Sequence, residues 1–439
     1  MPSVLFASIH CYLDFSSGAS VSVRDLLLSL CERGWRCQTL CGSGFDSSDM
    51  TPALVFNSFG LKPKSRRHES DQSNFSIHSF NDAGIESLVY QSRQPAPSSP
   101  TVWGHPYLQV LDRFLAARRP DVILTFGGGW IGRALLAVAR RHAVPSVFWL
   151  RTTRYEQKDL FEPVAGIIVP CQFTARHYKS SLGLNCDPIS SPIRLDRILC
   201  ENRDPRHLTF VGPRPDKGVF YFIRIAAELA RLRPDIPMLV IAGRGNEHWL
   251  KQAALNLHGL PNLHHMPATT DPRKFLSTTR AFLAPSLWLE TFMRVPAEGL
   301  FNGIPSLASR RGGIPETLGD SGFLFDVPPR YTPDSRCPPS ADEVRPWVQT
   351  IIRLWDDQRF YQEQSNRCLA EARRLMPEIV IPRHEAVLER ANRAVSPLPD
   401  TRLGLADDLA PLRRFLPDSM PHAEFVAEHA ATLDQMILS

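Results

Sequence analysis

The sequence predicts an α/β protein in which parallel sheets are covered by helices on both faces. Short apolar segments alternate with helical patterns in two successive stretches, one before the region 188–206 and one from 208 to 327. This alternation is typical of parallel strands joined by crossover helices. The region 188–206 is rich in proline and charge, which favours a domain junction there. A chain of 439 residues, 43% hydrophobic and 22% charged, is long enough for two globular domains with cores of their own.

The first stretch begins as a β-α-β unit. An apolar strand is expected at 4–9, followed by a turn-rich loop at 14–19 and a helix at 21–33. Gly34 ends this helix, because glycine readily takes the left-handed conformation that closes helices. A second strand is expected near 38–40. Further elements expected in this half are strands at 121–126, 146–150 and 166–169 and a helix at 131–142.

Other parts of the chain are less regular. Residues 42–104 are polar and show no clear periodicity. Residues 328–340 hold five prolines and are expected to form a loop, after which helical patterns resume at Ala341. We expect an N-terminal domain over 1–195, a C-terminal domain over 196–376, and a tail of unassigned role over 396–439.

Composition narrows the function classes. The net charge of +5 is small for this length and lacks the basic face of a general nucleic-acid binder. The nine cysteines have no paired zinc-finger spacing, so we expect reduced thiols in a cytoplasmic protein. The N-terminus lacks the features of a signal peptide, and no apolar run approaches the ~20 residues of a spanning helix. Membrane contact is therefore expected to be peripheral at most.

Two glutamates eight positions apart, Glu290 and Glu298, are the most informative local feature. A strand-like segment, 281–285, precedes the first, and a helical pattern with Pro296 near its start follows. Glu290 should thus lie on a strand-to-helix loop and Glu298 inside the helix. A helix N-terminus favours phosphate, and carboxylates on either side can accept hydrogen bonds from sugar hydroxyls. The pattern indicates a nucleotide-sugar pocket, although a bare pair at this spacing is more often two solvated acids.

The surrounding segments decide between a nucleotide-sugar pocket and two solvated acids. In chain order they are 210–218 (Phe-Val-Gly-Pro-Arg-Pro-Asp-Lys-Gly), 238–245, 302–305 (Asn-Gly-Ile-Pro) and 311–316 (Arg-Gly-Gly-Ile-Pro-Glu). With the two glutamates, they resemble the donor-binding half of family four of the retaining glycosyltransferases. The resemblance covers roughly 1–380 and is strongest over 207–327. It implies the GT-B fold: two Rossmann-like domains whose parallel sheets face each other across a cleft.

The resemblance also implies roles for individual residues. Glu298 would hold the ribose hydroxyls, Glu290 would contact the donor sugar, and Arg214 and Lys217 would hold the diphosphate. Further donor contacts are expected at Gly18, Arg151, Arg244, Thr291, Phe292, Met293 and Arg294. In the resembled family a late helix crosses back to the first domain, and 377–395 is expected to be that helix.

Some positions depart from the family pattern. Met293 stands where glycine is frequent, and Arg151 occupies the region of a common histidine. Arg214 and Lys217 are closer together than usual, and the loop before the first helix has only Gly18 in place of paired glycines. The departures concern the acceptor side and the catalytic contacts more than the donor half.

The expected chemistry needs no metal or other cofactor. The chain contains no Asp-x-Asp triplet, so the diphosphate would be neutralised by protein cations, mainly Arg214 and Lys217. A helix end contributes only about 0.3–2 kcal/mol to a nearby anion. The resemblance implies transfer of a sugar from a nucleotide-diphosphate sugar with retention of anomeric configuration. An internal-return mechanism needs no protein nucleophile. The acceptor, whether a glycan, a lipid-linked molecule or a small molecule, is not identified by the sequence.

Rival functions remain open. Residues 127–132 satisfy G-x-G-x-x-G after a strand, and Arg151 follows the next strand, as in an NADP-dependent reductase. This motif is not on the first strand, and no acid ends the next one, so the glycines also fit a loop that turns tightly beside the cleft. A catalytically degenerate nucleotide-sugar-binding protein is a second alternative. A GT-B epimerase or phosphorylase is a third.

Overall fold

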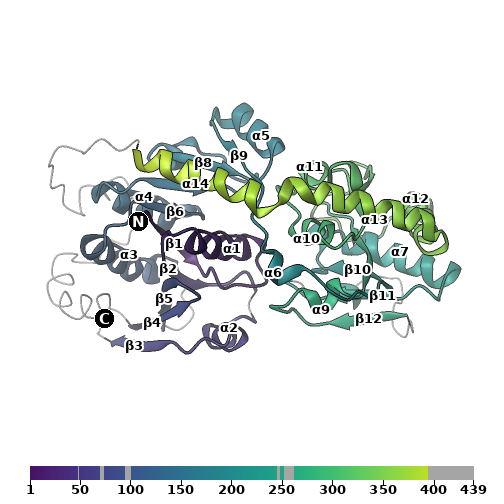
Figure 1. Ribbon diagram of the computed structural model, residues 1–439, viewed down its shortest axis with the longest axis horizontal. Coiled ribbons are helices and arrows are strands. Elements are labelled where there is room, and N and C mark those ends of the chain that lie inside the picture. Colours follow the sequence, from purple (N-terminus) through teal and green to yellow (C-terminus); the bar gives the residue numbers. More distant parts are fainter. Residues whose placement is uncertain (48, 70–73, 94–99, 245–247, 252–261, 394–439) are drawn as a thin grey trace.

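The computed structural model describes residues 1–393 apart from 48, 70–73, 94–99, 245–247 and 252–261. It has two α/β halves side by side, each built on its own sheet (Figure 1). The tail expected over 396–439 lies outside the described residues. The expected fold class is confirmed. The division of the chain at 195/196 and 376/377 stays a prediction.

The first sheet has nine strands in the order β3-β4-β5-β2-β1-β6-β7-β8-β9. The strands are β1 (Ser3–His10), β2 (Arg36–Gly44), β3 (Lys64–Glu69), β4 (Asn74–Asp82), β5 (Ile85–Ser92), β6 (Val122–Thr125), β7 (Ser146–Trp149), β8 (Gly166–Val169) and β9 (Asp187–Pro188). Its helices are α1 (Gly18–Glu32), α2 (Pro52–Ser58), α3 (Pro100–Ala117), α4 (Gly129–Arg141) and α5 (Gln172–Leu182), with a short 3-10 turn at Lys158–Phe161.

The parallel part of this sheet follows from its sequence. Val4, Leu5 and Phe6 of β1 are fully buried, because strands covered by helices on both faces need apolar side chains on both. β1 pairs in parallel with β2 and β6. The unassigned segment 42–104 supplies the edge, where β4 runs antiparallel to both β3 and β5. The parallel sheet thus carries an antiparallel extension on one side.

The first helix begins earlier than its apolar pattern. α1 starts at Gly18, so Gly18 and Ala19 belong to its first turn and not to the preceding loop. Gly34 lies just beyond the helix with φ +86°, as expected for a residue that closes it. Leu26, Leu27 and Leu30 pack this helix against the sheet.

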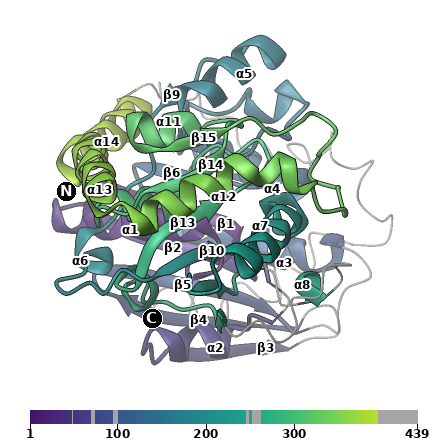
Figure 2. The ribbon, with the colours of Figure 1, turned by 90° about the vertical axis from the view of Figure 1, so that its right-hand side faces the viewer.

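The second sheet is parallel throughout, in the order β12-β11-β10-β13-β14-β15. Its strands are β10 (His207–Val211), β11 (Met238–Ile241), β12 (Leu263–Met266), β13 (Thr279–Ala284), β14 (Ser306–Ser309) and β15 (Phe323–Phe325). The helices around it are α7 (Val219–Leu232), α8 (His248–Lys251), α9 (Arg273–Leu276), α10 (Arg294–Leu300), α11 (Ile314–Leu318), α12 (Ala341–Asp356) and α13 (Gln358–Ala372). Figure 2 shows α7 and α12 side by side over one face of this sheet.

Two segments join the halves. The short helix α6 (Leu195–Ile198) lies in the junction, where Ile198 packs with residues of the second core. The last described helix, α14 (Pro377–Arg393), runs back over the first half (Figure 1). There Val380, Ile381 and Leu388 join a core that contains strand β1. The chain therefore crosses between the halves twice.

Candidate functional site

A cavity of about 740 Å³ lies between the two halves, at the carboxyl ends of their strands. This is where open α/β sheets generally bind ligands, and the volume is within the usual range for small-molecule sites. Ten of the eleven residues expected to form the site line it: Gly18, Arg151, Arg214, Lys217, Arg244, Glu290, Thr291, Phe292, Met293 and Arg294. Glu298 does not line it.

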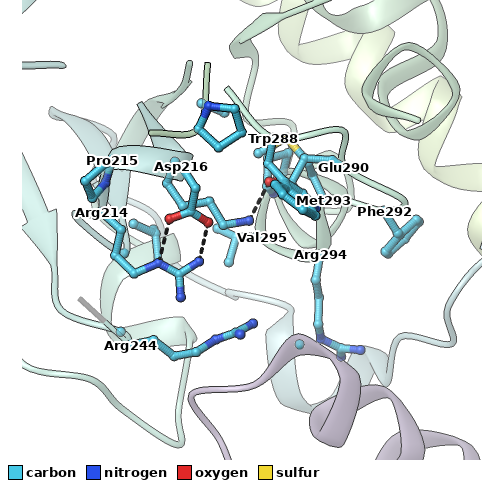
Figure 3. Close-up of a pocket in the computed structure, with 18 of the residues that line it drawn as sticks. Arg214, Pro215, Asp216, Arg244, Trp288, Glu290, Phe292, Met293, Arg294 and Val295 are labelled. Atoms are coloured by element: carbon cyan, nitrogen blue, oxygen red, sulfur yellow. Dashed lines mark hydrogen bonds and ion pairs between the residues drawn. The ribbon is translucent and has the colours of Figure 1, made fainter. Parts of the chain in front are cut away.

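Two of the expected cations lie on a tight turn after β10. A 3-10 turn at Pro215–Lys217 carries them, and Gly218 follows with φ +80°. A Cβ on Gly218 would lie 1.9 Å from the carbonyl oxygen of Pro285, so only glycine allows this approach to the end of β13. Arg214 forms a two-pronged ion pair with Asp216 (Figure 3). Lys217 donates to Glu290 over 2.5 Å. The short gap between Arg214 and Lys217 thus still directs both toward one cavity.

Glu290 is held from two sides on the loop after β13. It is only 6% exposed, and its carboxylate accepts from Ser286 Oγ at 2.7 Å as well as from Lys217. The Gly-Gly pair of the Arg311 motif explains part of this placement. Gly312 has φ +58°, and a Cβ there would lie 2.4 Å from the carbonyl oxygen of Glu290, while Gly313 N–H donates to that oxygen. The two glycines let the neighbouring loop lie directly on the Glu290 backbone.

Glu298 lies in α10, as expected, but faces an adjoining cavity of about 140 Å³. Its carboxylate forms an ion pair with Arg294 at 2.7 Å; Glu298 is buried, and the Arg294 side chain is 9% exposed. Burial raises the pKa of Glu298, and the positive charge of Arg294 opposes this rise. Arg294 and Gly18 line both cavities, so Glu298 lies behind Arg294 as seen from the larger one.

The ion pair continues into the other half of the molecule. Arg294 points toward α1 (Figure 3), where its guanidinium pairs with Asp25 and donates to Ser22 Oγ at 3.0 Å. Asp25 is fully buried and also accepts from Arg197 Nη1 at 2.7 Å. We call Asp25, Arg197, Arg294 and Glu298 the interdomain ion network. Asp25 and Arg197 are not among the residues expected from the sequence, because an acid inside an apolar helix and an arginine in a charged linker show no distinctive spacing.

Arg151 follows β7 and lies deep in the contact between the halves. It donates to Ser191 Oγ at 3.0 Å and to Ser22 Oγ at 3.2 Å, and its backbone oxygen accepts from Thr291 Oγ1 at 2.9 Å. Its guanidinium lies 4.9 Å from the centre of the Trp149 ring. Burial, together with the charge of Arg294, lowers the pKa of Arg151 to about 9. Arg151 thus supports the contact between α1, the linker and the second half.

The remaining expected residues are placed as follows. A Cβ on Gly18 would lie 3.9 Å from Arg294 Cβ, an ordinary contact, so the protein itself leaves room for a small side chain there. Arg244 pairs with Asp46 of the first half at 3.0 Å. The Met293 N–H lies 3.4 Å from Thr317 Oγ1. α10 has only seven residues, so most of the positive charge that faces the cavity comes from side chains.

The glycine-rich loop at 127–132 has a structural explanation. Gly127 and Gly129 have φ of +105° and +71°, and α4 begins at Gly129. A Cβ on Gly128 would lie 2.6 Å from the Tyr155 ring, and one on Gly132 would lie 2.6 Å from the Gly127 oxygen. None of these glycines lines the large cavity. The geometry favours a tight loop over a dinucleotide fingerprint.

Two further findings concern the part of the chain that the structure describes. Its helices include none that is both long enough and apolar enough to cross a bilayer. Over the same residues, no cluster of three or more histidine, cysteine or acidic side chains forms a metal site. All nine cysteines are free thiols in the structure.

Two family models match the chain, one on each half. The model described as "Glycosyl transferase 4-like domain" matches residues 17–183, and "Glycosyl transferases group 1" matches residues 205–335. Together they cover both walls of the cavity. Among curated proteins, none matches the sequence of this chain.

Solved structures share the whole architecture. Anabaena HepE in complex with UDP and glucose superposes with a TM-score of 0.61 at 16% identity, over 89% of this chain and 100% of that one. Sucrose-phosphate synthase from Thermosynechococcus elongatus superposes with a TM-score of 0.63 at 13% identity, over 90% and 100%. The trehalose 6-phosphate synthase of Burkholderia multivorans gives 0.59 at 10% identity, also over 90% and 100%. At these identities the likeness shows the fold, which is GT-B.

Proposed function

We propose, from the premise that this chain is a glycosyltransferase of the GT-B kind, that it transfers a hexosyl group from a nucleotide-diphosphate sugar with retention of configuration and without a metal ion. The observation that carries the proposal is the meeting of Arg214, Lys217 and Glu290 in one cavity that both halves of the molecule line. The solved HepE complex contains UDP and glucose, which makes UDP-glucose the first donor to test.

The charges of the cavity fit a diphosphate. Arg214 and Lys217 carry two positive charges on one tight turn, and a guanidinium and an ammonium are both strong phosphate donors. Lys217 now pairs with Glu290, so binding of a diphosphate would draw the ammonium away from that carboxylate. Glu290 would then be able to accept hydrogen bonds from hydroxyls of the donor sugar. Thr291, Phe292, Met293 and Arg244 would complete the donor pocket.

The nucleoside would lie toward the smaller cavity. Glu298 lines that cavity and would accept hydrogen bonds from the ribose hydroxyls, with Arg294 holding its carboxylate in place. Gly18 and Arg151 would approach from the first half. Gly18 lines both cavities and has no side chain to occupy the space between them.

The reaction would proceed by internal return. The bond between the anomeric carbon and the diphosphate oxygen breaks, and that oxygen takes the proton of the acceptor hydroxyl on the same face of the sugar. The acceptor oxygen then bonds to the anomeric carbon, so configuration is retained. Arg214 and Lys217 would stabilise the negative charge that grows on the leaving nucleoside diphosphate. The acceptor, a glycan, a lipid-linked molecule or a small molecule, would reach the cytoplasmic enzyme from solution or from a membrane surface.

A panel of UDP, GDP and ADP sugars tests the proposal. A ligand present at 100 times its dissociation constant adds about 2.7 kcal/mol of stability, which thermal shift detects. We expect one nucleotide series to stabilise the protein, and donor turnover to persist in EDTA. Absence of any stabilisation by the panel would refute the proposal. Activity lost in EDTA and restored by magnesium would refute its metal-free form.

A catalytically degenerate binding protein is the alternative that one observation favours. Lys217 and Glu290 neutralise each other, and Met293 stands beside them where the resembled family often has glycine. Slow hydrolysis of the bound donor in the absence of acceptor separates the two. An enzyme hydrolyses the donor over hours, whereas a binding protein returns it intact.

A further inference from the structure

The cavity carries more positive charge than a donor diphosphate requires. Seven arginine and lysine residues line it, against three carboxylates, Asp216, Glu290 and Asp334. Four of the cations have a carboxylate partner: Arg214, Lys217, Arg244 and Arg294. Three others, Arg151, Arg154 and Arg336, form no ion pair within the described ranges. An excess of this kind in a shared cavity indicates a second anionic ligand group.

These three arginines differ in the hydrogen bonds that they make. Arg151 donates to neutral side chains at the contact between the halves. Arg336 donates to carbonyl oxygens of its own loop and lies 5.0 Å from the centre of the Trp249 ring. Arg154 makes no hydrogen bond to the residues that the structure describes. Its guanidinium lies 4.1 Å from the centre of the Trp288 ring, a contact between the two halves.

This stacking prepares Arg154 to bind an anion. A guanidinium placed over an aromatic ring keeps the N–H groups at its edge free, and that edge matches carboxylate or phosphate in a two-pronged contact. The Trp288 backbone is held beside the Pro215–Lys217 turn, because its main-chain N–H donates to the main-chain oxygen of Asp216 at 3.1 Å. Trp288 lies two residues before Glu290, so their Cα atoms are at most about 7.6 Å apart. An anion on Arg154 would therefore lie close to the reacting end of the donor.

We propose that Arg154, held over Trp288, forms a subsite for an anionic group, a phosphate or a carboxylate, on the acceptor. The inference rests on the proposed function, because it assigns the acceptor side of that cavity. Arg154 belongs to the first half of the molecule, whereas Arg214 and Lys217 lie on the turn after β10 in the second half. Because the proposed donor contacts lie mainly in the second half, we assign the anion on Arg154 to the acceptor.

The test measures a second anion after the nucleotide site is filled. The full-length protein is saturated with the nucleoside diphosphate that stabilises it most, and inorganic phosphate, glucose 6-phosphate and glucose are then titrated by calorimetry. We expect phosphate and glucose 6-phosphate to bind and glucose to bind far more weakly. Arg154→Ala should weaken both anions by about tenfold or more, with nucleotide affinity unchanged within about twofold. Arg154→Lys, which keeps the charge but not the fork, should fall between.

Arg336→Ala is the matched control, since Arg336 also lines the cavity, stacks on a tryptophan and lacks a carboxylate partner among the described residues. It should leave phosphate affinity nearly unchanged. Equal losses in both variants would overturn the subsite in favour of diffuse charge. No phosphate binding beside the nucleotide would also overturn it.

Two further experiments distinguish the acceptor subsite from a donor-side anion site and from a failure of the proposed function. If Arg154→Ala weakens UDP-glucuronate but not UDP-glucose, the anion belongs to the donor and the acceptor assignment is wrong. If no nucleotide binds at all, the proposed function fails. Arg154 is then tested by measuring phosphate binding to the Arg214→Ala/Lys217→Ala double variant. The anion subsite stands only if adding Arg154→Ala weakens phosphate binding to that double variant.

Discussion

Replacing Asp25 by asparagine should destabilise the protein although Asp25 lies outside both cavities. Its carboxylate is fully buried and faces Arg197 Nη1 at 2.7 Å, and it also pairs with Arg294. Removing one partner of a buried ion pair lowers the free energy of unfolding by about 3–5 kcal/mol, because the other charge remains buried without compensation. Asparagine keeps one oxygen as an acceptor for Arg197, so we expect a loss of unfolding free energy at the lower end of this range, about 3 kcal/mol.

The matched control is Asp196→Asn. Asp196 also pairs with an arginine, Arg194, at 3.0 Å, but its side chain is 62% exposed. Exposed ion pairs contribute about 0–1 kcal/mol. The measurement is urea unfolding of the full-length variants at neutral pH, followed by tryptophan fluorescence. A cost for Asp25→Asn no greater than that for Asp196→Asn would refute the claim that the interdomain ion network stabilises the fold.

A second readout tests whether the network also positions Glu298. Arg294 contacts both Asp25 and Glu298, so losing Asp25 should loosen the arginine and weaken nucleotide binding. Asp25→Asn and Arg197→Met combined should show a coupling energy of about 1 kcal/mol or more in unfolding, since the two side chains are in direct contact. If nucleotide affinity is unchanged in Asp25→Asn, the interdomain ion network stabilises the fold but does not position Glu298.

Four further predictions follow from single residues. Glu298→Ala should weaken nucleotide binding by about 1.5–3 kcal/mol, measured by calorimetry, because the ribose contact exists in the ground state; affinity unchanged within about twofold contradicts the role. Lys217→Ala and Arg214→Ala should lower turnover more than donor affinity in steady-state kinetics, and equal losses in both constants would indicate ground-state attraction only. Gly18→Val should still fold and bind donor but transfer poorly; a loss of stability that parallels the loss of activity would make Gly18 structural. His384 is fully buried, and burial lowers its pKa to about 4, so its neutral form favours the fold and stability falls as pH drops below about 6.5. Between pH 7 and pH 5, His384 should lower the free energy of unfolding by about 2 kcal/mol. In the His384→Gln variant, urea unfolding should no longer show this part of the pH dependence.

The elements that sequence predicted are those whose information is local. The strand-to-helix loop with Glu290, the helix with Glu298 and the turn with Lys217 each follow from a few neighbouring residues. The double glycine at 312–313 likewise marks a loop that lies on the Glu290 backbone. Parallel strands buried on both faces are apolar, so β1, β6, β7 and β8 were predicted to within one residue at each end, whereas β2 (36–44) was expected only at 38–40.

Features that join distant residues were not predictable. Asp25 and Arg294 are 269 positions apart, and Trp288 receives Arg154 from the other half. The edge strand β3 was missed because it is exposed along one side and its sequence is correspondingly polar; it buries only His68. The neighbouring strand β4 is largely buried, but its sequence, Asn-Phe-Ser-Ile-His-Ser-Phe-Asn-Asp, interrupts the apolar residues with polar ones. Gly18 was placed in a loop because the first turn of α1 has no apolar pattern.

The two glutamates differ in how firmly their partners hold them, and this difference predicts how the site responds to a ligand. Glu290 is paired with Lys217, whose side chain is 28% exposed and ends in a flexible point charge. Glu298 is paired with Arg294, which is 9% exposed and fixed by Asp25 and Ser22 as well. A diphosphate can therefore draw Lys217 away from Glu290 at little cost, whereas moving Arg294 would break several buried contacts at once. Ligand binding should rearrange the first pair and leave the second intact. Because Arg294 also pairs with Asp25, it joins α10 to α1, and any opening of the cleft that separates these helices must first break the interdomain ion network.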